Sequence, residues 1–178
     1  MQVLGLCGVA RSGKDSFADF LIKLFPLKFS KASFAFYLKK DLDPFLLEKL
    51  NISAFTEDTT EKEIIRPLLI AWGTDVIRNN YDRKHWIKKI NKKVVENSKN
   101  NLITIIPDVR FDNELEWIGV RGKNIFINNP ACEPKGDLEL DTLKLKNSVD
   151  FYFEWNKMDD FENEGLMKVK NFYNSLCI

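Results

Sequence analysis

The chain has 178 residues, of which 44% are hydrophobic and 30% charged, and its formal net charge is +1. This length suits one domain with a hydrophobic core, so we predict a single domain over residues 1–178. The near-neutral charge argues against nucleic-acid or membrane binding, and no apolar run approaches the roughly 20 residues of a membrane span. The scattered Cys7, Cys132 and Cys177 form neither a disulfide framework nor a metal cluster, which favours the cytoplasm.

The first expected elements are a strand and a helix that flank a glycine-rich loop. Residues 3–7 (VLGLC) form a short apolar run, which is typical of a buried parallel strand. A helix is expected to begin near Lys14 and to stop before Pro26. Its apolar residues follow helical spacing and share one face: Phe17, Phe20, Leu21 and Leu24.

A second strand and the start of a further helix are expected next. Residues 29–35 (FSKASFA) alternate loosely between apolar and polar positions, which favours a strand. Asp43 followed by Pro44 is typical of a helix N-cap with proline at the first helical position. We therefore expect a helix to begin there.

Two more helices are expected before the centre of the chain. Thr60 and Glu63 match a capping box, and Pro67 is expected to kink or restart the helix that follows. Asp82 is expected to cap the next helix. The apolar face of that helix consists of Trp86, Ile87, Ile90 and Val94.

The second half of the chain carries the most buried-looking strand. Residues 102–107 (LITIIP) form that strand, which ends at Asp108, and residues 124–128 and 151–155 predict two more. A closing helix has an apolar face made of Leu166, Val169, Tyr173 and Leu176. Strands that alternate with helices predict an α/β fold, a three-layer sandwich with a parallel sheet. Residues 129–147 lack a firm period and are the candidate for a mobile flap.

The stretch GVARSGKDS, residues 8–16, matches the phosphate-binding pattern G-x-x-x-x-G-K. In such loops the glycines, here Gly8 and Gly13, let backbone N–H groups approach a phosphate, and the positive end of the next helix points at it. Lys14 would reach the β- and γ-phosphates. The strand before the loop and the helix after it provide the context that this pattern requires, so we predict a nucleotide site.

Asp15 stands where such loops usually carry the Ser or Thr that binds Mg²⁺. A carboxylate and a phosphate at 4 Å repel each other by about 4 kcal/mol at an effective dielectric constant of about 20. We expect either that Mg²⁺ lies against Asp15, directly or through water, or that Asp15 faces the acceptor. Ser16 would bind a phosphate or the metal. The residues expected to bind ATP in this stretch are Gly8, Arg11, Ser12, Gly13, Lys14, Asp15 and Ser16.

Several stretches resemble the deoxynucleoside monophosphate kinases of tailed bacteriophages. Residues 8–20 resemble the loop of that family, which carries GKD followed by Ser or Thr. Residues 71–86 (AWGTDVIRNNYDRKHW) resemble its G-T-D segment, and residues 105–119 (IIPDVRFDNELEWIG) its strand ending in P-D-x-R. Residues 35–42 resemble its A-x-P-[IL]-K segment more weakly. The ordered matches span residues 1–128.

The resemblance implies a reaction and a fold type. The family transfers the terminal phosphate of ATP to a deoxynucleoside 5′-monophosphate with Mg²⁺, on a P-loop nucleotide kinase fold. By this resemblance, residues 36–100 form an acceptor-binding helical region, residues 129–147 a lid, and the protein a homodimer. The resemblance also implies that adenine rests near Asn156, ahead of the last helix.

Catalytic and acceptor-binding residues follow from position and resemblance together. Asp108 lies at the carboxyl edge of the sheet, where α/β proteins bind ligands, and would hold the Mg²⁺ shell with Asp15 and Ser16. Arg110 would clamp a phosphate through its guanidinium group. The candidate catalytic residues are Lys14, Asp15, Asp108 and Arg110. The candidate acceptor-binding residues are Lys39, Arg66, Asp75, Arg78, Trp86 and Glu114.

The chain also departs from the family pattern. Asn129-Pro130 stands where the family carries an arginine-proline pair, and no His-x-[ST]-E element follows. The lysines that could replace the lid arginine are Lys135, Lys144 and Lys146. Two alternatives therefore stay open: a P-loop kinase for another small acceptor, and a nucleotide-binding module without turnover.

Overall fold

The structure is a computed structural model that describes residues 1–134, 136–156 and 158–176. Lys135 and Cys177 lie outside these residues. The chain divides into two units. We call Met1–Ala32 with Lys93–Ile178 the sheet unit, and Ser33–Lys92 the helical unit. The predicted single domain with its helical region over residues 36–100 stays a prediction.

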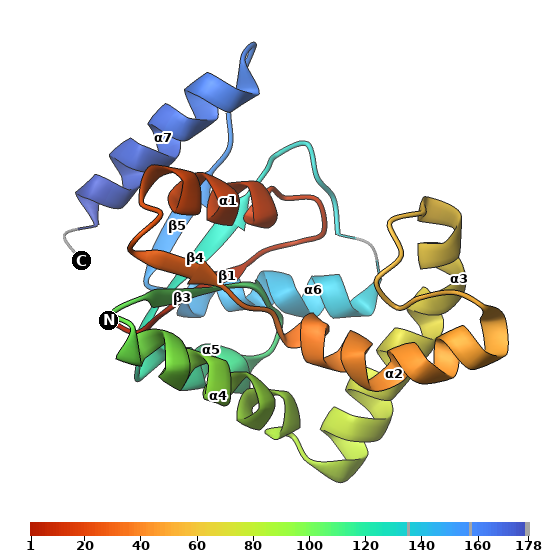
Figure 1. The fold of residues 1–178 in the computed structure, drawn as a ribbon. Coiled ribbons are helices and arrows are strands. Elements are labelled where there is room, and N and C mark those ends of the chain that lie inside the picture. The colour runs from red at the N-terminus through yellow and green to blue at the C-terminus, as the bar shows by residue number, and fades with distance from the viewer. Residues whose placement is uncertain (135, 157, 177–178) are drawn as a thin grey trace. The chain divides into compact units, whose positions relative to one another are not determined.

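The sheet unit contains five strands in the order β2-β3-β1-β4-β5, and every neighbouring pair is parallel (Figure 1). The strands are β1 (Val3–Cys7), β2 (Phe29–Lys31), β3 (Ile103–Val109), β4 (Gly122–Asn128) and β5 (Phe151–Glu154). The predicted parallel sheet is therefore confirmed. The strand expected over residues 29–35 is shorter than predicted and ends at Lys31.

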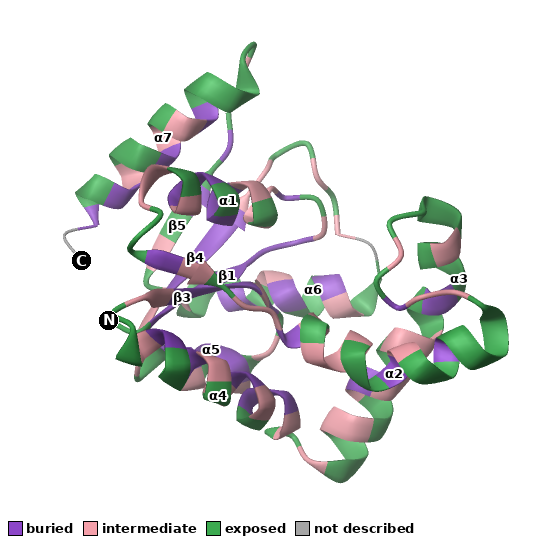
Figure 2. Cartoon of the chain, viewed as in Figure 1, coloured by how far each residue is buried: buried purple, intermediate pink, exposed green. Residues whose placement is uncertain are grey.

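Helices cover both faces of this sheet. Leu4 and Leu6 of β1 belong to one apolar cluster with α1 (Lys14–Leu24) and α7 (Phe161–Ser175). Gly5 points to the other face, where α5 (Asp112–Gly119) packs against the sheet. Alternate residues of a strand point to opposite faces, so β1 is buried from both sides. Figure 2 shows the strands largely buried, whereas the helices carry many exposed residues.

The helical unit begins with α2 (Phe34–Leu50), and Ser33 caps it by accepting a hydrogen bond from Phe36 N at 3.2 Å. The expected helix start at Asp43-Pro44 is therefore wrong, because Pro44 lies inside α2. The Asp43 carboxylate instead accepts hydrogen bonds from the loop that follows α2, at Ser53 Oγ and Ala54 N.

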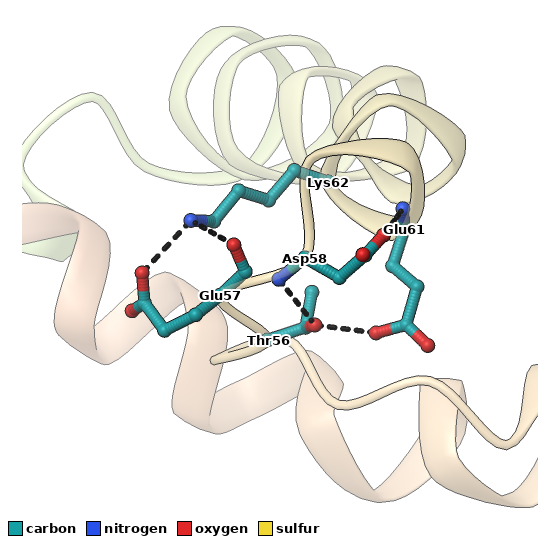
Figure 3. Close-up of polar contacts among 5 residues, drawn as sticks. All are labelled: Thr56, Glu57, Asp58, Glu61 and Lys62. Carbon is teal, nitrogen blue, oxygen red and sulfur yellow. Dashed lines mark hydrogen bonds and ion pairs between the residues drawn. The ribbon is translucent and has the colours of Figure 1, made fainter.

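Helix α3 (Thr59–Ile70) begins two residues earlier than the capping box predicted at Thr60 and Glu63. Asp58 is the N-cap and accepts from Glu61 N at 2.9 Å, while Thr56 donates to the Glu61 carboxylate (Figure 3). Lys62 adds an ion pair with Glu57 at 2.9 Å. Pro67 lies inside α3, which continues directly into the next helix.

That next helix is a π-helix, η1 (Ala71–Tyr81), and it contains the residues Gly73, Thr74 and Asp75 of the G-T-D segment, which continues into α4 (His85–Lys99). Helices of this type are rare and often occur at functional sites. After the π-helix, α4 follows, and Asp82 caps the turn before it by accepting from Lys84 N at 2.9 Å. The division between the two units falls inside α4.

The segment expected as a flap, residues 129–147, contains helix α6 (Asp137–Lys144), and the 3₁₀ helix η2 (Leu145–Ser148) follows. Closure of this segment over substrate stays a prediction. In the described part of the chain, no helix combines the length and the apolar character that a membrane crossing demands.

Candidate active site

The phosphate-binding loop joins β1 to α1 in the sheet unit. Gly13 is the N-cap of α1 with φ 84°, and Gly8 has φ 145°. A Cβ atom would lie 2.3 Å from Ile127 O at Gly8 and 2.3 Å from Trp155 Nε1 at Gly13. Both positions therefore require glycine for conformation and for space.

Lys14 folds over this loop. Its Nζ donates to the carbonyl oxygens of Gly8, at 2.9 Å, and of Val9. Burial lowers the pKa of Lys14, and the positive charge of Arg110 lowers it further. The charges that act in the opposite direction belong to Asp15, Cys7 and Glu139. Lys14 and Arg110 thus form a concentrated positive charge at the loop.

Asp108 and Arg110, at the end of β3, lie at the same edge of the sheet as the phosphate-binding loop. Strands β1 and β3 are neighbours, and Cys7 pairs with Val109. The chain continues from β1 into the phosphate-binding loop and from β3 into Arg110. After β1 the chain continues to α1 on one face of the sheet, and after β3 it continues to α5 on the other face. The gap between two neighbouring strands whose connections diverge in this way is the switch point at which α/β sheets bind ligands. Asp108 is half-buried and Arg110 exposed.

Glu114 supports the turn after β3. Its side chain is 5% exposed, and Oε2 accepts from Arg110 N at 2.9 Å and from Phe111 N at 3.2 Å. Charge-assisted hydrogen bonds of this kind are roughly twice as strong as neutral ones. The contact holds the backbone of Arg110, whereas binding of the acceptor by Glu114 stays a prediction.

Asp15 is exposed and forms an ion pair that the sequence pattern did not predict. Lys31 Nζ lies 2.8 Å from Asp15 Oδ1 and 3.0 Å from Asp19 Oδ1. Burial lowers the pKa of Lys31, but the hydrogen bonds to both carboxylates outweigh it, so the pKa is raised overall. The strand predicted over residues 29–35 placed Lys31 in its interior, so no signal in the sequence identified it; the structure ends β2 at Lys31.

The segment after β4 also contacts the loop. Cys132 Sγ donates to Arg11 O at 3.3 Å, and Arg11 has a positive φ of 63°. Glu139, in the first turn of α6, is buried and close enough to act on the charge of Lys14. Sequence reasoning missed Glu139 because the segment has no clear period.

Among the lysines considered as replacements for a lid arginine, two lie in the described residues. Lys144 forms an ion pair with Asp141 at 2.6 Å, and Lys146 Nζ lies 4.7 Å from the centre of the Tyr152 ring. Both contacts lie within the sheet unit. A role in catalysis stays a prediction for either lysine.

Asn156 is exposed and lines an open cavity of about 730 Å³ in the sheet unit. The strand β5, the loop after it and α7 form the walls, which include Glu154, Met158 and Lys168. Trp155, the neighbour of Asn156, is buried against the phosphate-binding loop. In the loop after β5, Trp155 therefore contacts the phosphate-binding loop, while Asn156 lines a cavity large enough for a ligand.

The remaining acceptor candidates lie in the helical unit, on several elements. Lys39, on α2, is half-buried, and its Nζ lies 5.7 Å from the centre of the Phe55 ring. Arg66 is exposed on α3. Binding of an acceptor by these cations stays a prediction.

The π-helix carries two further candidates. Asp75 is exposed and Arg78 half-buried. Trp86 is buried, and its Nε1 donates to Gly73 O at 2.9 Å, which ties α4 to the π-helix. This contact supports a packing role for Trp86, and stacking on a base stays a prediction.

The described residues contain no group of three or more His, Cys, Asp or Glu side chains arranged for a metal. Mg²⁺ is usually held by one or two carboxylates together with substrate phosphates and waters. Asp15, Ser16 and Asp108 supply oxygen donors of this kind. The donor set therefore fits a Mg²⁺ ion that arrives with a nucleotide.

The parallel sheet, the phosphate-binding loop and its lysine define an α/β nucleotide kinase fold. Dephospho-CoA kinase from Campylobacter jejuni has the same fold, with TM-score 0.58, 16% identity, and coverage of 98% of this chain and 96% of that one. Shikimate kinase from Aquifex aeolicus matches with TM-score 0.52, 17% identity, and coverage of 98% and 95%. TT1252 from Thermus thermophilus matches with TM-score 0.53, 10% identity, and coverage of 99% and 97%.

The chain belongs to the deoxynucleotide monophosphate kinase family, whose model matches residues 28–139. The matched residues include the G-T-D segment and the P-D-x-R strand end. None of the curated protein sequences compared with the chain matches it significantly.

Proposed function

We propose that the chain transfers the terminal phosphate of ATP to a deoxynucleoside 5′-monophosphate, giving the diphosphate and ADP. The observation that supports this most strongly is the pairing of Cys7 with Val109. It brings the start of the phosphate-binding loop and the turn at Arg110 to one edge of the sheet. The family membership supports the same reaction.

The chemistry needs cations and orientation more than a base. An oxygen of the acceptor phosphate attacks the γ-phosphorus of ATP, the bond from this phosphorus to the bridging oxygen breaks, and ADP leaves. The acceptor phosphate is already a nucleophile. Lys14 and Arg110 would stabilise the negative charge on the transferred group, and the loop N–H groups would hold the donor phosphates.

Asp15, Ser16 and Asp108 are the residues proposed to hold Mg²⁺. When bound, the ion offsets the charge of the donor phosphates and orients them. Asp15 and Asp108 would supply carboxylate oxygens, directly or through water, and Ser16 a hydroxyl oxygen. The Asp15→Asn variant should therefore need more Mg²⁺ for half-maximal turnover, and unchanged Mg²⁺ dependence would remove Asp15 from this set.

Acceptor and base contacts complete the proposal. Asn156 is proposed to contact the adenine of ATP. The residues proposed to bind the acceptor are Lys39, Arg66, Asp75, Arg78, Trp86 and Glu114. Replacing such a residue should raise the KM for the acceptor more than the KM for ATP. A homodimer and a cytoplasmic location stay predictions.

The experiment measures ADP release from Mg-ATP with each of the four deoxynucleoside monophosphates, with the matched ribonucleotides and with no acceptor. Lys14→Ala serves as the inactive control. We expect ADP only with deoxynucleotide acceptors, and its loss in Lys14→Ala. The panel also includes dephospho-CoA and shikimate, since kinases named for these compounds share the fold.

The results separate the three candidate functions. ADP formed only with another acceptor would replace the proposed substrate. Tight ATP binding without ADP release for any acceptor would favour a nucleotide-binding module. ADP formed equally without acceptor would indicate ATP hydrolysis and overturn the transfer reaction.

A further inference from the structure

The ammonium group of Lys31 bridges two carboxylates on the helix that follows the phosphate-binding loop. Its Nζ lies 2.8 Å from Asp15 Oδ1 and 3.0 Å from Asp19 Oδ1. Asp15 and Asp19 are four residues apart on α1 and therefore share one face of it. One cation thus holds both carboxylates.

The backbone of Lys31 is anchored in the sheet. Lys31 is the last residue of β2 and pairs with Ile105 of β3. The next residue, Ala32, donates its N–H to Ile105 O at 2.9 Å. The side chain therefore reaches α1 from a fixed origin, and the contact joins the carboxyl end of β2 to the first turn of α1.

The contact is too exposed to add much to folding stability. The side chains of Lys31 and Asp15 are 32% and 75% exposed, and ion pairs in contact with water contribute little to the free energy of unfolding. Its effect is instead local. Asp15 directly follows Lys14, at the helix end that would face a nucleotide's phosphates, where an uncompensated carboxylate opposes phosphate binding.

We propose that Lys31 is a positioning residue of the phosphate site, which holds the Asp15 carboxylate in place and offsets its negative charge. Lys31 acts through Asp15 and does not itself contact the phosphates. The inference rests on the proposed function only in that the loop binds ATP. It adds the end of a third strand, β2, to the ends of β1 and β3 that form the site.

The test measures the Kd of ATP in EDTA by calorimetry, so that Mg²⁺ binding at Asp15 does not enter. Lys31→Met should weaken ATP binding about tenfold, because the repulsion between Asp15 and the phosphates is no longer offset. Lys31→Arg should keep the Kd of ATP within about threefold of the wild-type value, since a guanidinium also pairs with carboxylates. In the Asp15→Asn background, Lys31→Met should change the Kd less than about twofold.

The matched control is Lys23→Met. Lys23 lies on α1 and pairs with Glu162 at the exposed surface, so its loss should leave the Kd unchanged. The melting temperature of each variant is measured alongside, and we expect no change for Lys31→Met. An equal loss of affinity with and without Asp15 would show that Lys31 contacts phosphate directly and would overturn the proposal. An unchanged Kd in Lys31→Met would also overturn it.

The measurement is independent of the acceptor. If the wild-type protein binds ATP but phosphorylates no deoxynucleotide, the proposed function fails and the Kd values still decide the role of Lys31. If deoxynucleotides are phosphorylated and the Kd values do not depend on Lys31, only the present inference fails.

Discussion

Trp155 closes one side of the phosphate-binding loop at Gly13. A Cβ atom at Gly13 would lie 2.3 Å from the indole Nε1 and 3.0 Å from Cδ1. Trp155 follows the last strand of the sheet and is 3% exposed. A side chain more than 140 residues away in sequence therefore packs against the loop. It covers Gly13 and leaves no room there for a methyl group.

Gly13→Ala should destabilise the protein by two separate effects. The left-handed backbone costs about 1–2 kcal/mol for a non-glycine residue, and the clash with Trp155 adds about 1–3 kcal/mol. Gly13→Ala in a Trp155→Ala background isolates the first effect, because the backbone strain at Gly13 remains while the indole that the methyl group would meet is absent. Urea denaturation in both backgrounds measures the difference, and equal losses would contradict the contact with Trp155.

Trp155 should report nucleotide binding by its fluorescence. Because its indole lies against Gly13, phosphates that bind the loop are expected to change its emission. Trp155→Phe should abolish the ATP-dependent part of the signal. Trp117→Phe, which removes a ring covered by Arg121 at 4.9 Å, should retain it. A signal that survives Trp155→Phe would place the nucleotide away from this loop.

Glu114→Gln should weaken the turn that carries Arg110. The substitution keeps the shape but removes the charge that strengthens the hydrogen bonds to Arg110 N and Phe111 N, so we expect a loss of about 1–2 kcal/mol. The exposed Glu116 lies on the same helix, and Glu116→Gln should change stability by less than about 0.5 kcal/mol. Denaturation together with steady-state kinetics checks both variants. Equal stability of the two would contradict the support role.

The two described cysteines should differ in reactivity. Burial raises the pKa of the Cys7 thiol to about 12, whereas Cys132 is half-exposed beside Arg11. Because the thiolate is the reactive form, iodoacetamide at pH 8 should modify Cys132 well before Cys7. Peptide mapping by mass spectrometry after timed quenching measures both rates. Modification of Cys7 at a similar rate would mean that the end of β1 opens readily.

The first strand, the loop and α1 were predictable because their signals are local. The apolar run of β1, the G-x-x-x-x-G-K spacing and the helical spacing after Lys14 each lie within about 20 residues. The structure confirms β1 at Val3–Cys7 and α1 at Lys14–Leu24. Strand β3 was found within two residues of its ends for the same reason, since its apolar run is continuous.

The helical unit was predicted less well, because contacts outside each segment decide its helix ends. Asp43-Pro44 has the composition of a helix start, yet Pro44 lies inside α2 while Asp43 binds the loop at Ser53 and Ala54. The π-helix over Ala71–Tyr81 has no pattern that distinguishes it from an α-helix in the sequence. The hydrogen bond from Trp86 Nε1 of α4 to Gly73 O of the π-helix is one of the tertiary contacts made by this helix.

The sequence by itself determined that this protein has a parallel α/β fold, a phosphate-binding loop and the residue types of a kinase. Only the tertiary structure decided which side chains meet around that loop. Lys31, Glu139 and Trp155 reach it from three other elements. The physical reason is the parallel sheet, since its strands pair residues far apart in the chain and bring their carboxyl ends to one edge.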